Sequence, residues 1–162
     1  MSNIDLRQTI AGYMDEAERR YQTEGDAENG LIVSEILGDD GSWRVYIQIT
    51  DDEETRRVVI HADLPVRIPD TNRLKVAELL TRINYELIIG NFELNFEDGE
   101  VLFKTTLDLA DGQLTQAMFE RMYEINGHSM NQNYAKILSV GYGEAGSAKL
   151  EEESRPEGVS LQ

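Results

Sequence analysis

The sequence predicts an α+β domain of two layers, in which helices pack on one face of an antiparallel sheet. Three observations support this class. In three separate segments, apolar residues recur every three or four positions, which is typical of amphipathic helices. Between these segments apolar and polar residues alternate, as they do in half-buried strands. Asp98-Gly99 lies between two such runs, where it favours a tight hairpin. The expected element order is α-β-β-β-α-β-β-α.

The N-terminal half is predicted to form one helix and a three-stranded meander. The helix covers residues 4–22 and carries a narrow apolar stripe, and a polar linker follows at 24–30. Strands are expected at residues 31–37, 43–49 and 57–64, because apolar residues alternate there between clusters of turn-forming residues.

A second helix is predicted over residues 71–89, with Asp70 as its N-cap and Gly90 at its end. Its apolar residues form two adjacent stripes. The first stripe consists of Val76, Leu79, Leu80, Ile83 and Leu87, and the second of Leu74, Ala77, Tyr85 and Ile88. One stripe suffices to cover a sheet. The second therefore indicates either a contact with a partner or second subunit, or burial under the first helix.

The hairpin after this helix has a register that its loop determines. A two-residue type I′ turn at Asp98-Gly99 predicts the cross-strand pairs Phe96–Val101, Leu94–Phe103 and Phe92–Thr105. These pairs share one face of the hairpin. The other face carries Glu93 opposite Lys104, which is a favourable charge pair.

The last helix is expected over residues 114–140, with a bend or break at Asn126-Gly127. Beyond this dipeptide the apolar positions rotate around the helix axis, and glycine is a poor residue in a helix interior. We expect a single domain over residues 1–143. Residues 144–162, which carry five acids and two bases, are expected to form an acidic, disordered tail.

Composition excludes several classes of function. The formal charge of −16 repels phosphate backbones at long range, which argues against nucleic-acid binding and suits solubility or basic partners. The chain has no cysteine, so disulfides and thiolate chemistry are excluded. No apolar run approaches the ~18 residues that span a bilayer, and the N-terminus lacks a secretory pattern. We therefore expect a soluble, cytoplasmic protein without membrane contact.

No motif predicts catalysis, a metal or a cofactor. Residues 141–146 read G-x-G-x-x-G, but a helix rather than a strand is expected before them, which does not give dinucleotide-binding geometry. His61 and His128 have no partner at metal spacing, and a hydrolase built on them is a remote alternative. The acidic clusters at 39–40 and 51–54 lie in predicted turns, where we expect solvated carboxylates.

A basic segment interrupts this acidic chain. Six bases and three acids give it a charge of +3, and the bases are Arg56, Arg57, Arg67, Arg73, Lys75 and Arg82. Bases that converge would bind an anionic ligand or an acidic client segment. Otherwise they neutralise acidic neighbours within the fold or across a dimer interface.

The helix end at Asn84, residues 90–94 and residues 98–101, taken with the element order, resemble the YbjN-type family. The resemblance covers about residues 4–143 in architecture and is sharpest over 83–107. It implies the fold of type III secretion chaperones, which are small, acidic, often dimeric proteins without catalytic residues. The family's label, sensory transduction regulator, names no biochemical mechanism, and no functional residue can be carried over.

The leading functional hypothesis is a non-enzymatic, chaperone-like or regulatory adaptor that forms a homodimer and binds an unknown protein client. Its predicted binding or dimer surface consists of Leu74, Tyr85, Ile88, Phe119 and Tyr123. Methionines in the last helix suit adaptable binding surfaces. The alternative hypothesis is a regulatory domain that senses a small anionic ligand through the basic segment.

Overall fold

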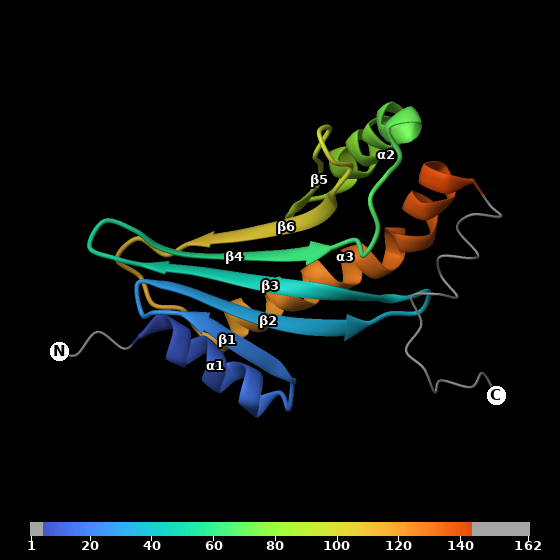
Figure 1. Ribbon diagram of the computed structural model, residues 1–162. Coiled ribbons are helices and arrows are strands. Elements are labelled where there is room, and N and C mark those ends of the chain that lie inside the picture. The colour runs from blue at the N-terminus through green and yellow to red at the C-terminus, as the bar shows by residue number, and fades with distance from the viewer. Residues whose placement is uncertain (1–4, 144–162) are drawn as a thin grey trace, which may run out of the picture.

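A six-stranded antiparallel sheet and three α-helices form residues 5–143, the part of the chain that the computed structural model describes (Figure 1). In chain order the elements are α1 (Leu6–Glu16), β1 (Tyr21–Gly25), β2 (Asn29–Leu37), β3 (Ser42–Asp51), β4 (Arg56–Asp63), the 3-10 turn η1 (Asp70–Asn72), α2 (Arg73–Glu86), β5 (Asn91–Leu94), β6 (Val101–Asp108) and α3 (Gln116–Tyr142). The strand order is β1-β2-β3-β4-β6-β5. The predicted α+β class is confirmed.

The helices lie on one face of the sheet, and no described helix covers the other. Helix α1 contacts β2 and β3, and α3 crosses β4 and β6, as Figure 1 shows. Side chains therefore alternate in burial along the central strands. The members that face the helices are buried and form the core, for example Trp43, Val45, Ile47, Val58 and Ile60. We call the opposite, uncovered surface the open face.

The edge strand β1 was not predicted, and the order is therefore α-β-β-β-β-α-β-β-α. The predicted helix over 4–22 ends at Glu16, and Glu18 adopts a left-handed φ of 54° that reverses the chain. The strand contains a single apolar residue, Tyr21, and four of its five residues are exposed. An edge strand with so little to bury shows no alternation of apolar residues, so its sequence reads as a linker.

The hairpin of β5 and β6 forms, but its predicted register is wrong by two residues. Phe92 lies opposite Phe103, and Leu94 lies opposite Val101. The loop is longer than a two-residue turn, because the Asn95 N–H donates to the Glu100 carbonyl at 2.9 Å. A shift of two residues keeps every side chain on its predicted face. The predicted ion pair between Glu93 and Lys104 also forms, at 2.7 Å.

Contact with the preceding segment explains the longer loop. Gly99 adopts a φ of +81°, and a Cβ built on it would lie 2.2 Å from the Ile68 carbonyl oxygen. The Ile68 N–H donates to the Gly99 carbonyl at 2.8 Å, so the loop packs on the chain between β4 and α2. This tertiary contact is not visible in the local pattern of the hairpin.

The predicted break at Asn126-Gly127 is wrong, since α3 runs without interruption from Gln116 to Tyr142. The apolar positions rotate because α3 changes neighbours along its length. Its first turns pack on α1, where the rings of Phe119 and Tyr13 lie 6.0 Å apart. Gly127 permits close approach to β2, because a Cβ on it would lie 3.0 Å from Ile36 Cδ1.

Asn126 fixes α3 to the sheet. Its side chain is fully buried, and its Nδ2 donates to the Ile60 carbonyl at 2.8 Å and to the Phe103 carbonyl at 3.2 Å. It also lies 3.3 Å from Thr105 Oγ1. One amide group therefore bonds to both β4 and β6, the two strands that meet from distant parts of the chain.

The start of α2 also differs from the prediction. Asp70 does not cap the helix, since it begins η1 and pairs with Arg73 at 3.2 Å. The helix ends at Glu86, before the predicted end, because Leu87 is already extended. Gly90 adopts a left-handed φ of 78° and leads into β5.

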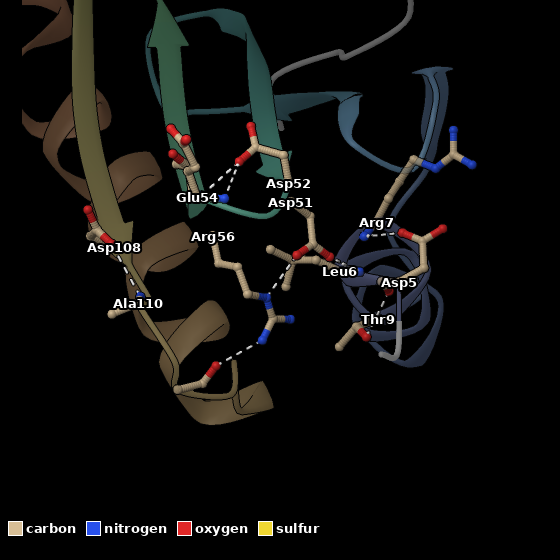
Figure 2. Close-up of polar contacts among 12 residues, drawn as sticks. Asp5, Leu6, Arg7, Thr9, Asp51, Asp52, Glu54, Arg56, Asp108 and Ala110 are labelled. Carbon is tan, nitrogen blue, oxygen red and sulfur yellow. Dashed lines mark hydrogen bonds and ion pairs between the residues drawn. The ribbon is translucent and has the colours of Figure 1, made fainter. Parts of the chain in front are cut away.

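Asp51 joins three parts of the chain at the end of β3, as Figure 2 shows. Its Oδ2 accepts from the Leu6 N–H in the first turn of α1 at 3.1 Å, and its Oδ1 accepts from Arg56 Nε at 2.8 Å. Arg56 in turn donates to the Gly112 carbonyl before α3. Only 7% of the Asp51 side chain is exposed, so the expectation of a solvated carboxylate at this position is wrong.

Replacing Asn126 with alanine should lower the free energy of unfolding by about 2–4 kcal/mol, because it removes the buried hydrogen bonds from α3 to β4 and β6 and opens a cavity. Urea unfolding measures the change. Gln132→Ala, at an exposed position of the same helix, is the matched control and should change stability by less than about 0.5 kcal/mol. An equal effect of the two substitutions would contradict the anchoring role of Asn126.

Asp51→Ala should destabilise the protein by about 2–3 kcal/mol, because Arg56 and the first N–H of α1 lose a nearly buried partner. Asp108→Ala is the control, since it removes the more exposed pair of Arg57 and Asp108 and should cost at most about 1 kcal/mol. Thermal unfolding of both variants tests the ranking, and a larger cost at Asp108 would overturn it.

Candidate functional site on the outer surface of α2

Three large apolar side chains project from α2 and the chain that follows it. Leu74 is 76% exposed, Tyr85 is 88% exposed and Ile88 is 98% exposed. Leu74 and Tyr85 are eleven positions apart, which is close to three helical turns, so they lie on the same side of the helix. We call these three residues the α2 surface. All three belong to the second stripe predicted from the sequence.

The first stripe of α2 does pack inward. Val76 and Leu80 are buried, and Leu79, Ile83 and Leu87 pack against the core while partly exposed. The helix is therefore amphipathic in the ordinary sense, and the α2 surface adds apolar residues to a side that faces solvent.

Phe119 and Tyr123, which the sequence also suggested for this surface, lie elsewhere. Phe119 is fully buried and Tyr123 is 5% exposed. The Tyr123 hydroxyl donates to Ser34 Oγ at 3.2 Å, and the Arg19 guanidinium stacks over its ring at 4.2 Å. These two side chains hold α3 against β2 and the α1–β1 connection. They are core residues and do not line a surface groove.

Hydrogen bonds hold α2 in place at both ends. Near its C-terminus, Asn84 Oδ1 accepts from the Phe92 N–H at 2.7 Å and Asn84 Nδ2 donates to the Phe92 carbonyl at 3.0 Å. At its N-terminus Asn72 donates to the Gly141 carbonyl at 2.9 Å. Arg73 donates to the Phe96 carbonyl at 2.7 Å, which ties the hairpin loop to the start of the helix. The α2 surface is thus presented on a well-supported element.

The basic segment does not form a single patch. Five of its six bases are already paired with carboxylates: Arg56 with Asp51, Arg57 with Asp108, Arg67 with Glu100, Arg73 with Asp70, and Arg82 with Glu78. The pairs are distributed over β4, the chain after it and α2. This arrangement corresponds to neutralisation within the fold, and it gives little support to an anion site.

The open face carries two adjoining hollows that the sequence did not indicate. One, of about 450 Å³, lies over β1, β2 and β3, and the other, of about 410 Å³, lies over the ends of β3 and β4. Glu35, Arg44 and Tyr46 line both hollows. These residues are the polar members of alternating strands, which sequence reasoning treats as solvent-facing. Only the strand order shows that they lie side by side.

Charged groups on this face perturb one another. In the strand register Arg44 lies opposite Glu35 on β2 and opposite Asp63 on β4. Partial burial raises the pKa of Asp63 to about 6, with a smaller contribution from Glu100, while Arg67 acts in the opposite direction. Burial lowers the pKa of His61, and the repulsion from Lys104 adds to the effect.

The geometry offers no support for the hydrolase alternative. His61 lies on the open face, whereas His128 is exposed on α3, which packs against the other face. Among residues 5–143 no cluster of three or more His, Cys, Asp or Glu side chains has a metal-binding arrangement. Gly141 lies in the last turn of α3, so the glycine pattern that begins there follows a helix, and its remaining residues from 144 onward lie outside the described range.

None of the described helices combines the length and the apolar character needed to cross a bilayer.

Comparison with known proteins points to one family. The family model YbjN, described as "Putative bacterial sensory transduction regulator", matches residues 6–139. Among solved structures, the "Crystal structure of YbjN, a putative transcription regulator from E. coli" is similar, with a TM-score of 0.56 and 13% sequence identity. The match covers 77% of this chain and 85% of that chain, and at this identity it shows the fold alone. No curated protein matches the sequence.

Replacing Asp63 with asparagine should stabilise the protein above pH 6, because the neutral amide removes the cost of ionising a half-buried carboxylate. We expect a gain of only about 1 kcal/mol, since solvent screens part of that cost. The ordinary pKa of this carboxyl is 3.8, so the folded state binds its proton more tightly than the unfolded state. The cost of ionising Asp63 therefore develops as the pH rises from about 4 to 6, and it disappears at lower pH.

Urea unfolding of both proteins between pH 4 and pH 8 measures this difference. Glu35→Gln, at an exposed position on β2, which β3 separates from β4, is the control and should change stability by less than about 0.5 kcal/mol. A stabilisation by Asp63→Asn that is largest at pH 4 would have the wrong sign and would contradict the argument.

Proposed function

The chain belongs to the YbjN family, and from this premise we propose that it is a non-enzymatic regulatory adaptor that binds a partner protein through the α2 surface. The observation that carries the proposal is the exposure of Leu74 and Tyr85 on the well-supported helix α2 and of Ile88 just after its end. Single exposed apolar residues are common on protein surfaces, whereas several gathered on one surface mark an interaction site.

The distribution of exposed apolar residues supports this choice of surface. The large hydrophobic side chains exposed within residues 5–143 are Leu37, Leu74, Tyr85, Ile88, Phe96 and Met118. Three of them form the α2 surface, and Phe96 lies in the hairpin loop that Arg73 fastens to the start of α2. Most of the exposed apolar area is therefore gathered around one helix.

The charges around α2 favour association in an otherwise acidic protein. Lys75 and Arg82 balance Glu78 and Glu86 along the exposed side of the helix, and Glu78 pairs with Arg82 at 2.7 Å. The exposed side of α2 is therefore close to neutral, although the whole protein carries a charge of −16. A partner with an apolar patch and a mixed-charge rim would meet no large repulsion there.

A chaperone-like role and a homodimer through the same surface are the finer hypotheses that the sequence raised. An adaptor site and a dimer interface place the same demand on Leu74, Tyr85 and Ile88, because each requires apolar side chains that are exposed in the monomer. The two uses differ in the mass of the purified protein, so one experiment separates them.

The test is a variant that carries Leu74→Ser, Tyr85→Ser and Ile88→Ser. Its free energy of unfolding should stay within about 0.5 kcal/mol of the unchanged protein, because the three side chains bury little area. Capture of partners from a bacterial lysate should fall at least about tenfold, the usual consequence of losing central apolar contacts. Leu37→Ser, which removes an exposed apolar residue far from α2 along the chain, is the matched control and should retain capture.

Light scattering coupled to size exclusion completes the experiment. If the unchanged protein is a dimer and the triple variant a monomer, the α2 surface joins two copies and the adaptor proposal is wrong. Undiminished capture by a folded triple variant would also contradict it, and global unfolding of the variant would show that these residues belong to the core.

A further inference from the structure

The two outer edges of the sheet differ in how they are protected. At β5 the edge is closed, because the side chain of Asn84 bonds to both the N–H and the carbonyl of Phe92, and α2 packs alongside. At β1 the edge is open along most of its length, and residues 22–25 are exposed. Figure 1 shows β1 at the margin of the sheet opposite β5. An open edge offers unpaired main-chain groups to another strand.

Alternation identifies which main-chain groups of β1 point outward. The Asp26 N–H donates to the Asn29 carbonyl across the β1–β2 turn, so the polar groups of Asp26 point toward β2. In an antiparallel ladder every second residue points the same way, and Tyr21, Thr23 and Gly25 therefore point outward. The Gly25 carbonyl is already occupied in the single copy, because it accepts from Arg7 on α1 at 2.7 Å.

We propose that β1 pairs with β1 of a second copy of this chain, antiparallel and about a two-fold axis through Thr23, so that two sheets become one. In this register all three outward-pointing residues enter the ladder. Thr23 lies opposite its own copy, and Tyr21 lies opposite the partner's Gly25. The Tyr21 N–H of one copy replaces Arg7 as the donor to the Gly25 carbonyl of the other.

The side chains at this seam are self-complementary, which is what an interface between identical surfaces requires. Arg20 lies opposite the partner's Asp26, a pair of opposite charges, and Gln22 lies opposite the partner's Glu24. Tyr21, whose hydroxyl donates to Asp15 on α1 at 2.9 Å, lies opposite the partner's Gly25, which has no side chain to clash with the ring. No two like charges face each other across the seam.

Neighbouring registers lack this match. An axis through Glu24 would set that carboxylate against its own copy, and an axis through Gly25 would place Glu24 opposite the partner's Asp26. Only the axis at Thr23 sets Tyr21, Thr23 and Gly25 all opposite residues of the partner's β1, and it does so without a directly opposed like-charge pair. Register is therefore specified by the sequence of the edge itself.

The seam would also enlarge the open face. Gln22 and Glu24 line the hollow of about 450 Å³, together with Arg20. Pairing at β1 brings the hollows of the two copies next to each other across the axis. Because each copy carries a charge of −16, long-range repulsion opposes the dimer, and added salt should strengthen it.

Disulfide trapping tests the register, because the chain contains no cysteine of its own. Opposed residues in a hydrogen-bonded antiparallel pair have Cα atoms about 5.5 Å apart, within the range that a disulfide spans. Thr23→Cys should therefore form a covalent dimer on mild oxidation. Gln22→Cys and Glu24→Cys should each trap at least about tenfold less when alone, since each lies opposite a different residue. A mixture of these two variants should trap a mixed dimer efficiently.

The outcomes separate this seam from the α2 surface. Thr81→Cys, exposed on the outer side of α2, reports contacts between copies at that helix. Trapping at position 81 instead of 23, or equal trapping at 22, 23 and 24, would overturn the proposal, as would a protein that stays monomeric at high salt and concentration. Thr23→Cys combined with the three serine substitutions on α2 should still trap a dimer, so failure of one proposal does not imply failure of the other.

Discussion

The contact between the Asn126 amide and the carbonyls of β4 and β6 is the constraint on which the rest of the fold depends. These strands are neighbours in the sheet although the whole α2–β5 segment separates them in the chain. The buried Nδ2 group would be costly to leave without acceptors, so its hydrogen bonds specify how α3 lies across both strands. Once α3 is placed, its ends determine the position of α1 through Phe119 and Tyr13, and that of α2 through Asn72.

The sequence predicted the parts of the fold in which one local pattern decides the structure. Alternation between apolar and polar residues identified β2, β3 and β4, and apolar spacing identified the two stripes of α2, of which the structure buries the first. The pattern failed where tertiary contacts decide. Gly99 packs on Ile68 and lengthens the hairpin loop, and Gly127 serves close packing rather than a break. The strand β1 buries almost nothing, so its sequence has no alternation of apolar residues from which it could be predicted.

The candidate site was predictable in part for the same reason. A helical wheel shows that Leu74 and Tyr85 share a side, but it does not show which of several apolar stripes remains uncovered. Phe119 and Tyr123 have the same chemistry and lie in the core. The bases of residues 56–82 were conspicuous in the sequence, yet their carboxylate partners come from segments as distant as Asp108 and Glu100. Pairing of this kind becomes visible only after the strands are ordered in space.

The long segment between β4 and β6, which contains α2 and β5, affects the order in which the fold forms. Strands β1 to β4 form a meander of consecutive hairpins, which need only short loop closures. Pairing of β6 with β4 requires closure of a much longer loop, which is slower because more chain entropy is lost before contacts compensate. Helix α2 lies within that loop and gains its contacts with α3 only when the loop closes. A nascent or partly folded chain would therefore hold the meander without a correctly placed α2, and recognition through this helix would be restricted to molecules that have completed folding.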